Sequence, residues 1–330
     1  MILVIGEALI DLIENRYQPG SFNAIVGGAN ANVALALARR GTAHQFLGRI
    51  SGDRFGKIIR DRLESNQVQL DYSIAADELT TLAVVSIDSH GVPSYSFYVN
   101  GTADWGWTNE ELPTDSQIAE LGATTIQFGC LTMAMAPGNA VIEAWAKRHF
   151  DAETLTISHD INMRPALGFK AEVERQRVER VNQISHLIKA SDEDIEWLYG
   201  LDHSNPATES RIDQIVAEWI GQTDRLVLVT RGGDGVSIYR GQQARIDVPS
   251  RKINVVDTVG AGDTFCANLL GQLSDADALG TKPFERLAAL SDDMLSEFVR
   301  VAGVAASITC ERAGCEPPTT DDLDSVLVSL

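Results

Sequence analysis

The chain has 330 residues, of which 44% are hydrophobic and 22% are charged. This composition is that of an ordinary globular protein and excludes a disordered or fibrous chain. The 46 acidic and 27 basic side chains give a net charge of -19, which would repel a phosphate backbone, so nucleic acid is not an expected partner.

Cysteine usage and the N-terminus indicate the compartment. Cys130, Cys266, Cys310 and Cys315 form no C-x-x-C pair, so reduced thiols are expected rather than disulfides or a zinc site. The apolar segment 1–11 lacks basic residues at its start and is too short for a membrane span. These features predict a cytoplasmic protein with no membrane partner.

Short apolar runs flanked by turn residues recur along the chain. Such runs are typical of strands that are buried on both faces of a parallel sheet. They lie at residues 2–5, 45–47, 124–128, 154–158, 187–189 and 226–230. Helical periodicity occurs between them, and this alternation predicts an α/β fold with helices on both faces of a mostly parallel sheet.

One region departs from this alternation. Residues 81–88 and 94–99 are rich in β-branched and aromatic residues, and a turn is expected at 89–91. Together with residues 11–26 they predict a small β-sheet inserted into the core as a lid, with lid segments at about 11–26 and 80–104. No linker or repeat divides the chain, so a single domain over residues 1–330 is expected.

The segment Asp257-Thr-Val-Gly260-Ala261-Gly262-Asp263 is the most informative motif. It is expected to run from a strand end through two glycines into a helix, where the N–H groups of residues 260–263 can face an anion. A carboxylate at Asp263 would repel a bound phosphate, but it suits the acceptance of a proton from an attacking hydroxyl group. The alternative, from position alone, is that Asp263 caps the helix.

A second pair of glycines, Gly27-Gly28, opens another predicted helix. Asn32 offers both donor and acceptor groups there, and Asp11 follows the first strand at the edge where such sheets bind ligands. These residues suit a ligand with several hydroxyl groups. Helix capping is the alternative role for Asn32.

Other nucleotide-binding motifs are not matched. The segment 52–58 resembles a Walker A loop but has three residues between its glycines instead of four, and Ile58 stands where Ser or Thr holds magnesium. The segment 27–32 lacks the spacing of a dinucleotide fingerprint, which disfavours a nicotinamide dehydrogenase.

Six motifs in order along the chain resemble those of the ribokinase family, the PfkB-type carbohydrate kinases. They begin at Gly6, Gly27, Gly48, Asp160, Thr230 and Asp257. The Gly-Glu-Ala-Leu-Ile-Asp opening and the segment 309–314 are most similar to those of bacterial fructokinases. The resemblance implies a ribokinase-like three-layer α/β/α core with a small β-sheet lid.

The resemblance also implies roles for individual residues. Asp263 would be the catalytic base, and the amides of Gly260, Ala261 and Gly262 would form an anion hole. The sugar would be bound by Asp11, Gly27, Gly28, Asn32 and Arg164, the adenine nucleotide by Thr230, Gly232 and Gly235, and a monovalent cation by Asp257. The implied cofactors are ATP and Mg²⁺, with K⁺ as a possible addition, and a homodimer through the lid is expected.

Two departures from the family pattern bear on metal and substrate. Asp194 ends the Ser191-Asp-Glu-Asp194 segment where the family often has Asn-x-x-Glu, so it is not assigned as a direct magnesium ligand. Val99 stands where kinases of ketodeoxygluconate commonly carry a basic residue, which favours a neutral sugar.

The expected activity is therefore the phosphorylation of fructose to fructose 6-phosphate by ATP. The alternatives are a kinase of 2-keto-3-deoxygluconate, ribose, inositol or a nucleoside, or a sugar-binding protein without catalysis, although the latter would be expected to lose Asp263.

Overall fold

The computed structural model describes residues 1–15, 17–18, 20–87 and 93–330. An eight-stranded sheet runs through its centre in the order β14-β13-β12-β11-β10-β9-β1-β4. Neighbouring strands are parallel from β4 to β12, and β13 is antiparallel to both of its neighbours. The strands are β1 (Ile2–Ile5), β4 (His44–Leu47), β9 (Thr125–Gly129), β10 (Thr156–Asp160), β11 (Leu187–Ser191), β12 (Leu226–Thr230), β13 (Val236–Arg240) and β14 (Ile246–Val248).

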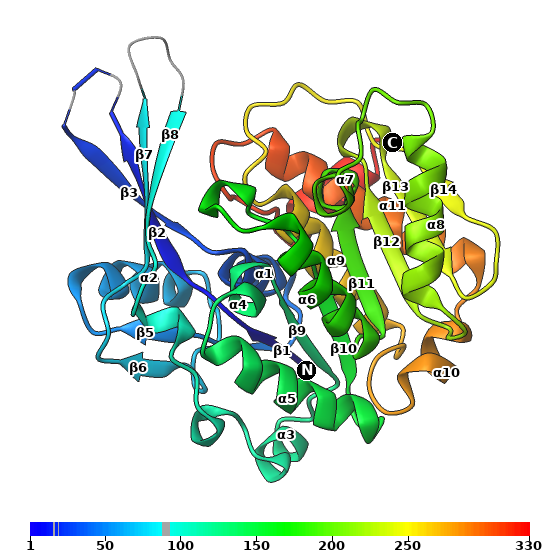
Figure 1. Ribbon diagram of the computed structural model, residues 1–330, viewed down its shortest axis with the longest axis horizontal. Coiled ribbons are helices and arrows are strands. Elements are labelled where there is room, and N and C mark those ends of the chain that lie inside the picture. Colours follow the sequence, from blue (N-terminus) through cyan, green and yellow to red (C-terminus); the bar gives the residue numbers. More distant parts are fainter. Residues whose placement is uncertain (16, 19, 88–92) are drawn as a thin grey trace.

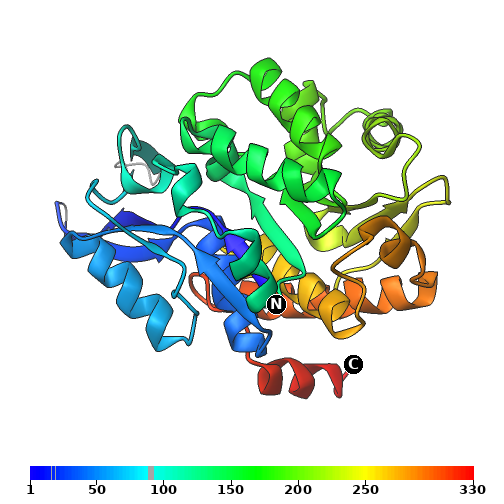
Figure 2. The same cartoon turned by 90° about the horizontal axis from the view of Figure 1, so that it is seen from below.

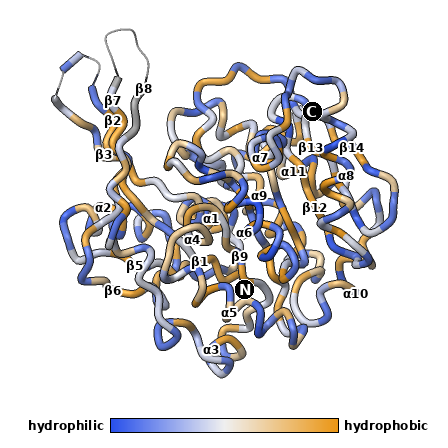
Figure 3. The backbone as a smooth tube through the Cα atoms, in the orientation of Figure 1, coloured by the Kyte–Doolittle hydropathy of each residue, from blue (hydrophilic) through white to orange (hydrophobic). Residues whose placement is uncertain are grey.

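This sheet confirms the predicted α/β fold. All six predicted core strands are present, and their ends differ from the prediction by at most two residues. Hydrophobic residues follow the strands at the centre of the molecule (Figure 3). These strands are buried along almost their whole length, which is why they appear in the sequence as continuous apolar runs.

Alternate side chains of the central strands pack against helices on opposite faces. Ile2 and Val4 of β1 belong to a cluster with α1, α9 and α11, whereas Leu3 and Ile5 join a cluster with α5. Figure 2 shows the green helices on one side of the sheet and the orange helices on the other. The core therefore has three layers, as the period-2 alternation of a strand requires.

The helices are α1 (Ala29–Arg40), α2 (Arg54–Ser65), α3 (Asp115–Glu120), α4 (Cys130–Ala134), α5 (Gly138–Asp151), α6 (Ala171–Gln183), α7 (Asp192–Tyr199), α8 (Thr208–Ile220), α9 (Ala261–Asp275), α10 (Pro283–Ala288), α11 (Asp292–Cys310) and α12 (Thr320–Leu327). Short 3-10 helices are η1 (Ala103–Trp105), η2 (Asn109–Glu111), η3 (Pro165–Leu167) and η4 (Gly232–Asp234). No helix of the described chain is long and apolar enough to cross a membrane.

A four-stranded sheet projects from one side of the core (Figure 1). It has the order β3-β2-β7-β8 and consists of β2 (Leu9–Glu14), β3 (Phe22–Gly27), β7 (Leu82–Ile87) and β8 (Pro93–Tyr98). This confirms the small inserted sheet, while the predicted turn at 89–91 lies outside the described residues. A further two-stranded sheet, β5 (Arg49–Ser51) with β6 (Ile74–Ala76), was not anticipated from the sequence.

Candidate active site

A cavity of about 450 Å³ lies between the four-stranded sheet and the core. Asp11 and Phe97 line it from the sheet, and Val99 lines it just after β8. The core contributes residues from the N-termini of α1 and α9 and from the loop after β10. Eight of the residues proposed from the sequence meet here: Asp11, Gly27, Gly28, Asn32, Arg164, Gly260, Gly262 and Asp263.

Asp263 lies in the first turn of α9, and only 5% of its surface is exposed. Asn32 Nδ2 donates to Asp263 Oδ2 at 2.8 Å, and Asn162 Nδ2 donates to Oδ1 at 3.1 Å. Burial raises the pKa of Asp263, while the Asn32 hydrogen bond and the charges of Arg164 and Lys189 act to lower it. The carboxylate is thus fixed in position and faces the cavity, as a proton acceptor requires.

The start of α9 differs from the expected strand-to-helix turn, because residues 249–256 belong to no strand. Gly260 begins the helix with a φ of 77°, and a Cβ atom there would lie 2.2 Å from Cys315 Sγ. The Ala261 N–H donates to Thr258 O at 3.2 Å, so this amide is used within the turn. Gly260 and Gly262 line the cavity, and Ala261 is not among its lining residues.

A buried ion pair lies beneath this helix start. Lys189 Nζ, on β11, donates to both carboxylate oxygens of Asp160 at 3.0 and 3.1 Å. Burial by itself would lower the pKa of Lys189. The negative charges of Asp160, Asp194 and Asp263 outweigh burial and raise this pKa above its usual value, so the ammonium group stays charged. A Cβ atom on Gly262 would lie 2.9 Å from Lys189 Nζ, so either this ammonium group or the helix start would have to shift to admit it. Lys189 is not recognisable as a site residue from the sequence, since a lysine within an apolar strand has no partner in the local pattern.

Three of the residues proposed for the sugar, Asp11, Gly27 and Gly28, line the cavity near the four-stranded sheet. Asp11 is half-buried on β2, and burial raises its pKa to about 6 although the Arg164 guanidinium acts against this shift. Gly27 allows the Asp11 carboxylate to approach, because a Cβ atom there would lie 2.3 Å from Asp11 Oδ2. Gly28, with a φ of 106°, would place a Cβ atom 2.5 Å from Glu7 O. Both glycines are therefore needed for close packing at this edge of the cavity.

Glu7 is a cavity residue to which the sequence analysis gave no role. It is 1% exposed, and its Oε1 accepts the Ala29 N–H at 2.9 Å at the start of α1. Oε2 accepts Asn30 Nδ2 at 3.0 Å and the hydroxyl group of Thr132. The carboxylate thereby connects the segment after β1 with α1 and α4. In the sequence, the indication of a role for Glu7 is its position just after a predicted strand.

Arg164 lines the cavity. Its Nη1 donates to Asn162 Oδ1 at 2.5 Å and to Met163 O at 3.0 Å. Among the described residues that line the cavity, Arg164 is the one basic side chain, and it is accompanied by the carboxylates of Glu7, Asp11, Glu193 and Asp263. The cavity therefore has an excess of negative charge.

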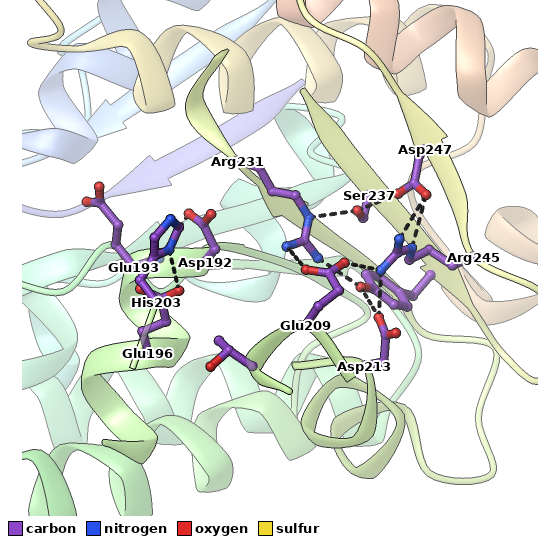
Figure 4. A network of polar contacts seen from close by, with 12 residues as sticks. Asp192, Glu193, Glu196, His203, Glu209, Asp213, Arg231, Ser237, Arg245 and Asp247 are labelled. Atoms are coloured by element: carbon purple, nitrogen blue, oxygen red, sulfur yellow. Dashed lines mark hydrogen bonds and ion pairs between the residues drawn. The ribbon is translucent and has the colours of Figure 1, made fainter. Parts of the chain in front are cut away.

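The residues proposed for the nucleotide, Thr230, Gly232 and Gly235, lie at the end of β12 and outside the cavity lining. Arg231 lies within this turn and holds it in place. Its guanidinium group forms an ion pair with Glu209 Oε2 at 2.7 Å and donates a hydrogen bond to Ser237 Oγ at 2.9 Å (Figure 4). Glu209, on α8, also pairs with Arg245, which lies just before β14 and pairs with Asp247 on that strand.

Asp257 and Asp194 both hold backbone N–H groups. Asp257 Oδ2 accepts the Gly314 N–H at 2.8 Å, and Oδ1 accepts that of Val259 at 3.1 Å. Asp194 accepts the N–H groups of Met163 at 2.7 Å and Ser191 at 2.8 Å. The Asp194 carboxylate thereby ties the loop after β10 to the start of α7.

Comparison with known proteins identifies the class of protein. Residues 1–322 match the model of the pfkB family of carbohydrate kinases, and the chain belongs to this family. The family prediction and the predicted ribokinase-like fold are confirmed.

The individual proteins that match the chain include fructokinases. The chain is 33% identical to a fructokinase of Rhizobium leguminosarum over 89% of this chain and 85% of the relative, and 32% identical to a fructokinase of Klebsiella pneumoniae over 99% of both. The crystal structure of a fructokinase from Xylella fastidiosa with bound ATP superimposes with a TM-score of 0.85, at 27% identity over 99% of this chain and 98% of that one.

Proposed function

We propose that this protein is an ATP-dependent fructokinase that converts fructose to fructose 6-phosphate. The observation that carries the proposal is the Asp263 carboxylate, held by Asn32 and Asn162 at the start of α9 and facing a cavity closed by the small sheet. The similarity to curated fructokinases over nearly the whole chain supports the choice of substrate. The Xylella relative with bound ATP supports the choice of phosphoryl donor.

Proton transfer is the task of Asp263 in this proposal. The sugar hydroxyl oxygen forms a bond to the γ-phosphorus while the bond from that phosphorus to the bridging oxygen breaks, and ADP leaves with the bonding electrons. Asp263 accepts the proton of the hydroxyl group. Asn32 and Asn162 keep the carboxylate oriented, and Asp11 accepts hydrogen bonds from other sugar hydroxyl groups.

Charge stabilisation comes from the start of α9. The N–H groups around Gly260 and Gly262 and the positive end of the helix dipole favour negative charge on the transferring phosphoryl group. We propose that Mg²⁺ enters bound to ATP, where it neutralises phosphate charge, and that a K⁺ ion is held by Asp257 and carbonyl oxygens of the adjoining loop. Thr230, Gly232 and Gly235 are the proposed nucleotide contacts, and the need for ATP is consistent with a cytoplasmic location.

The charge in the cavity predicts the substrate preference. A substrate carboxylate would meet one guanidinium, that of Arg164, among four carboxylates, whereas hydroxyl groups find acceptors there. Val99 lines the cavity and supplies no cation. We expect kcat/KM for fructose to exceed that for 2-keto-3-deoxygluconate by at least about tenfold, or about 1.4 kcal/mol.

An ADP-release assay over ketoses, aldoses, nucleosides and sugar acids tests this proposal. Asp11→Asn should narrow the difference between fructose and the acid sugar, because it removes one repelling charge. The second candidate, an acid-sugar kinase, is favoured by the position of Arg164 in the cavity and would replace the first if ketodeoxygluconate is the better substrate.

Replacing K⁺ in the assay by a bulky organic cation should lower the rate of phosphorylation. Equal rates with the two cations would contradict the proposed K⁺ site.

We also propose that the lid forms a homodimer. Its two edge strands carry exposed apolar side chains, with Phe22 40% and Ile25 41% exposed on β3 and Tyr98 60% exposed on β8. Pairing with a second copy would cover these side chains and the open sheet edges. Sedimentation should give a dimer at micromolar concentration, and a clean monomer would exclude this arrangement.

A further inference from the structure

The lid joins the core where its strands begin and end. The chain enters at Ala8 before β2, leaves at Gly28 after β3, enters again at Thr81 before β7, and leaves after Tyr98 at the end of β8. The position of Asp11 over the cavity depends on these junctions, because Asp11 lies three residues beyond Ala8 on β2.

Asp104 lies where these junctions meet. Its side chain reaches two chain segments that are far apart in the sequence: Oδ1 accepts the Ala8 N–H at 2.8 Å, and Oδ2 accepts the Thr81 hydroxyl at 2.5 Å. Thr81 Oγ1 also lies 2.6 Å from Thr102 Oγ1, on the segment that returns from β8. The Asp104 carboxylate thus connects two of the four junctions directly, and Thr81 links them to a third.

The surroundings of Asp104 hold it in place without a cation. It is 1% exposed, and no ion pair forms with it among the described residues. Next to it, Trp105 packs with Leu9 of β2, Ala29 of α1 and Leu131 of α4, so η1 is wedged between the lid and the core. A buried carboxylate without a cation is unfavourable unless its hydrogen bonds are made, and here backbone and hydroxyl donors make them.

Resting on the sugar kinase activity proposed above, we propose that Asp104 is a positioning residue for sugar binding. It fixes the starts of β2 and β7 relative to the core, and through β2 it sets the position of Asp11 at the sugar. Asp104 does not line the cavity itself, so it acts on the substrate through the lid strands.

Steady-state kinetics of Asp104→Ala and Asp104→Asn test this inference. For Asp104→Ala we expect the KM for the sugar to rise about fivefold or more, the scale of losing a buried hydrogen bond, while the KM for ATP stays within about twofold. Asp104→Asn keeps an oxygen for the Ala8 N–H and should recover part of the loss. A fall in kcat with an unchanged sugar KM in both variants would overturn the proposal, because it would indicate only a loss of folded protein.

Hydrogen exchange provides a readout that does not depend on activity. Exchange in residues 9–14 and 82–87 should accelerate in Asp104→Asn while exchange in β10 and β11 stays unchanged. The matched control is Thr156→Val, which removes a similar buried acceptor of a backbone N–H, that of Gly280 at 3.0 Å, at the opposite end of β10 from the cavity. It should leave the sugar KM and the lid exchange unchanged, and an equal effect in the control would contradict the assigned role.

The kinetics use whichever sugar the wild-type protein phosphorylates best in the panel. If fructose is not that sugar, the proposed fructokinase activity fails while the Asp104 inference is still tested. If Asp104→Ala does not fold, Asp104→Asn and Thr102→Val replace it in the exchange and kinetic measurements. Thr102→Val removes the hydroxyl that contacts Thr81. Both variants should raise the sugar KM, and a wild-type sugar KM in both would refute the inference.

Discussion

Asp263→Asn is expected to reduce kcat by about 10²–10⁴-fold, the range for loss of a general base. Asparagine keeps the shape of the side chain but cannot accept the proton of the sugar hydroxyl. Its amide group would also face one of the two amide donors, Asn32 Nδ2 or Asn162 Nδ2, that hold the carboxylate. ATP and sugar affinities, measured by calorimetry, should nevertheless stay within a few-fold of the wild type.

The control for this variant lies on the same helix. Asp275 is the last residue of α9, and its side chain is 64% exposed and paired with Arg40. Asp275→Asn should leave the turnover unchanged, since it makes the same chemical substitution far from the cavity. The assignment of Asp263 as the base is wrong if Asp263→Asn retains more than half of the wild-type turnover.

Gly262→Ala is expected to reduce kcat by about 10²–10³-fold, the range for loss of a donor from an anion hole. The backbone at Gly262 is not left-handed, so the effect is steric: the added Cβ atom would lie 2.9 Å from Lys189 Nζ. Lys189 cannot retreat easily, because both oxygens of Asp160 hold its ammonium group. The first turn of α9, which carries the anion hole and Asp263, must shift instead.

A helical glycine with free space provides the comparison. Gly303 lies within α11, and a Cβ atom there would meet no heavy atom within 4 Å. Gly303→Ala should leave kcat unchanged and raise the melting temperature slightly, since alanine favours the helix. If Gly262→Ala stays within about threefold of the wild-type kcat, the contact between this position and Lys189 does not control the position of the first turn of α9.

Several features followed from local patterns in the sequence. Buried strands such as β1 and β12 are recognisable because both of their faces must be apolar. The lid strands β7 and β8 are recognisable because they are short, rich in β-branched and aromatic residues and separated by turn residues. The glycines at 260 and 262 marked a helix start with exposed amides, and Asp263 within it stood out because a carboxylate does not suit a phosphate site. These signals arise from residues within one or two turns of each other.

The partners of these residues could not be identified in this way. Asn32 and Asp263 share a hydrogen bond across 231 positions of sequence, and Asp104 reaches Ala8 across 96. Lys189 and Asp160 are paired because β10 and β11 are adjacent and place these two residues side by side. Nothing in the apolar pattern around Lys189 indicates that pairing.

The sequence by itself determined the class of fold, the lid and the position of the proposed base, since each depends on the periodicity or turn chemistry of a short segment. Only the tertiary structure decided which side chains surround that base, which charged group lies against Gly262, and which groups the buried Asp104 carboxylate accepts. The physical reason is that burial and charge pairing depend on strand order and helix packing, which bring distant segments together and leave no periodic signal in either one.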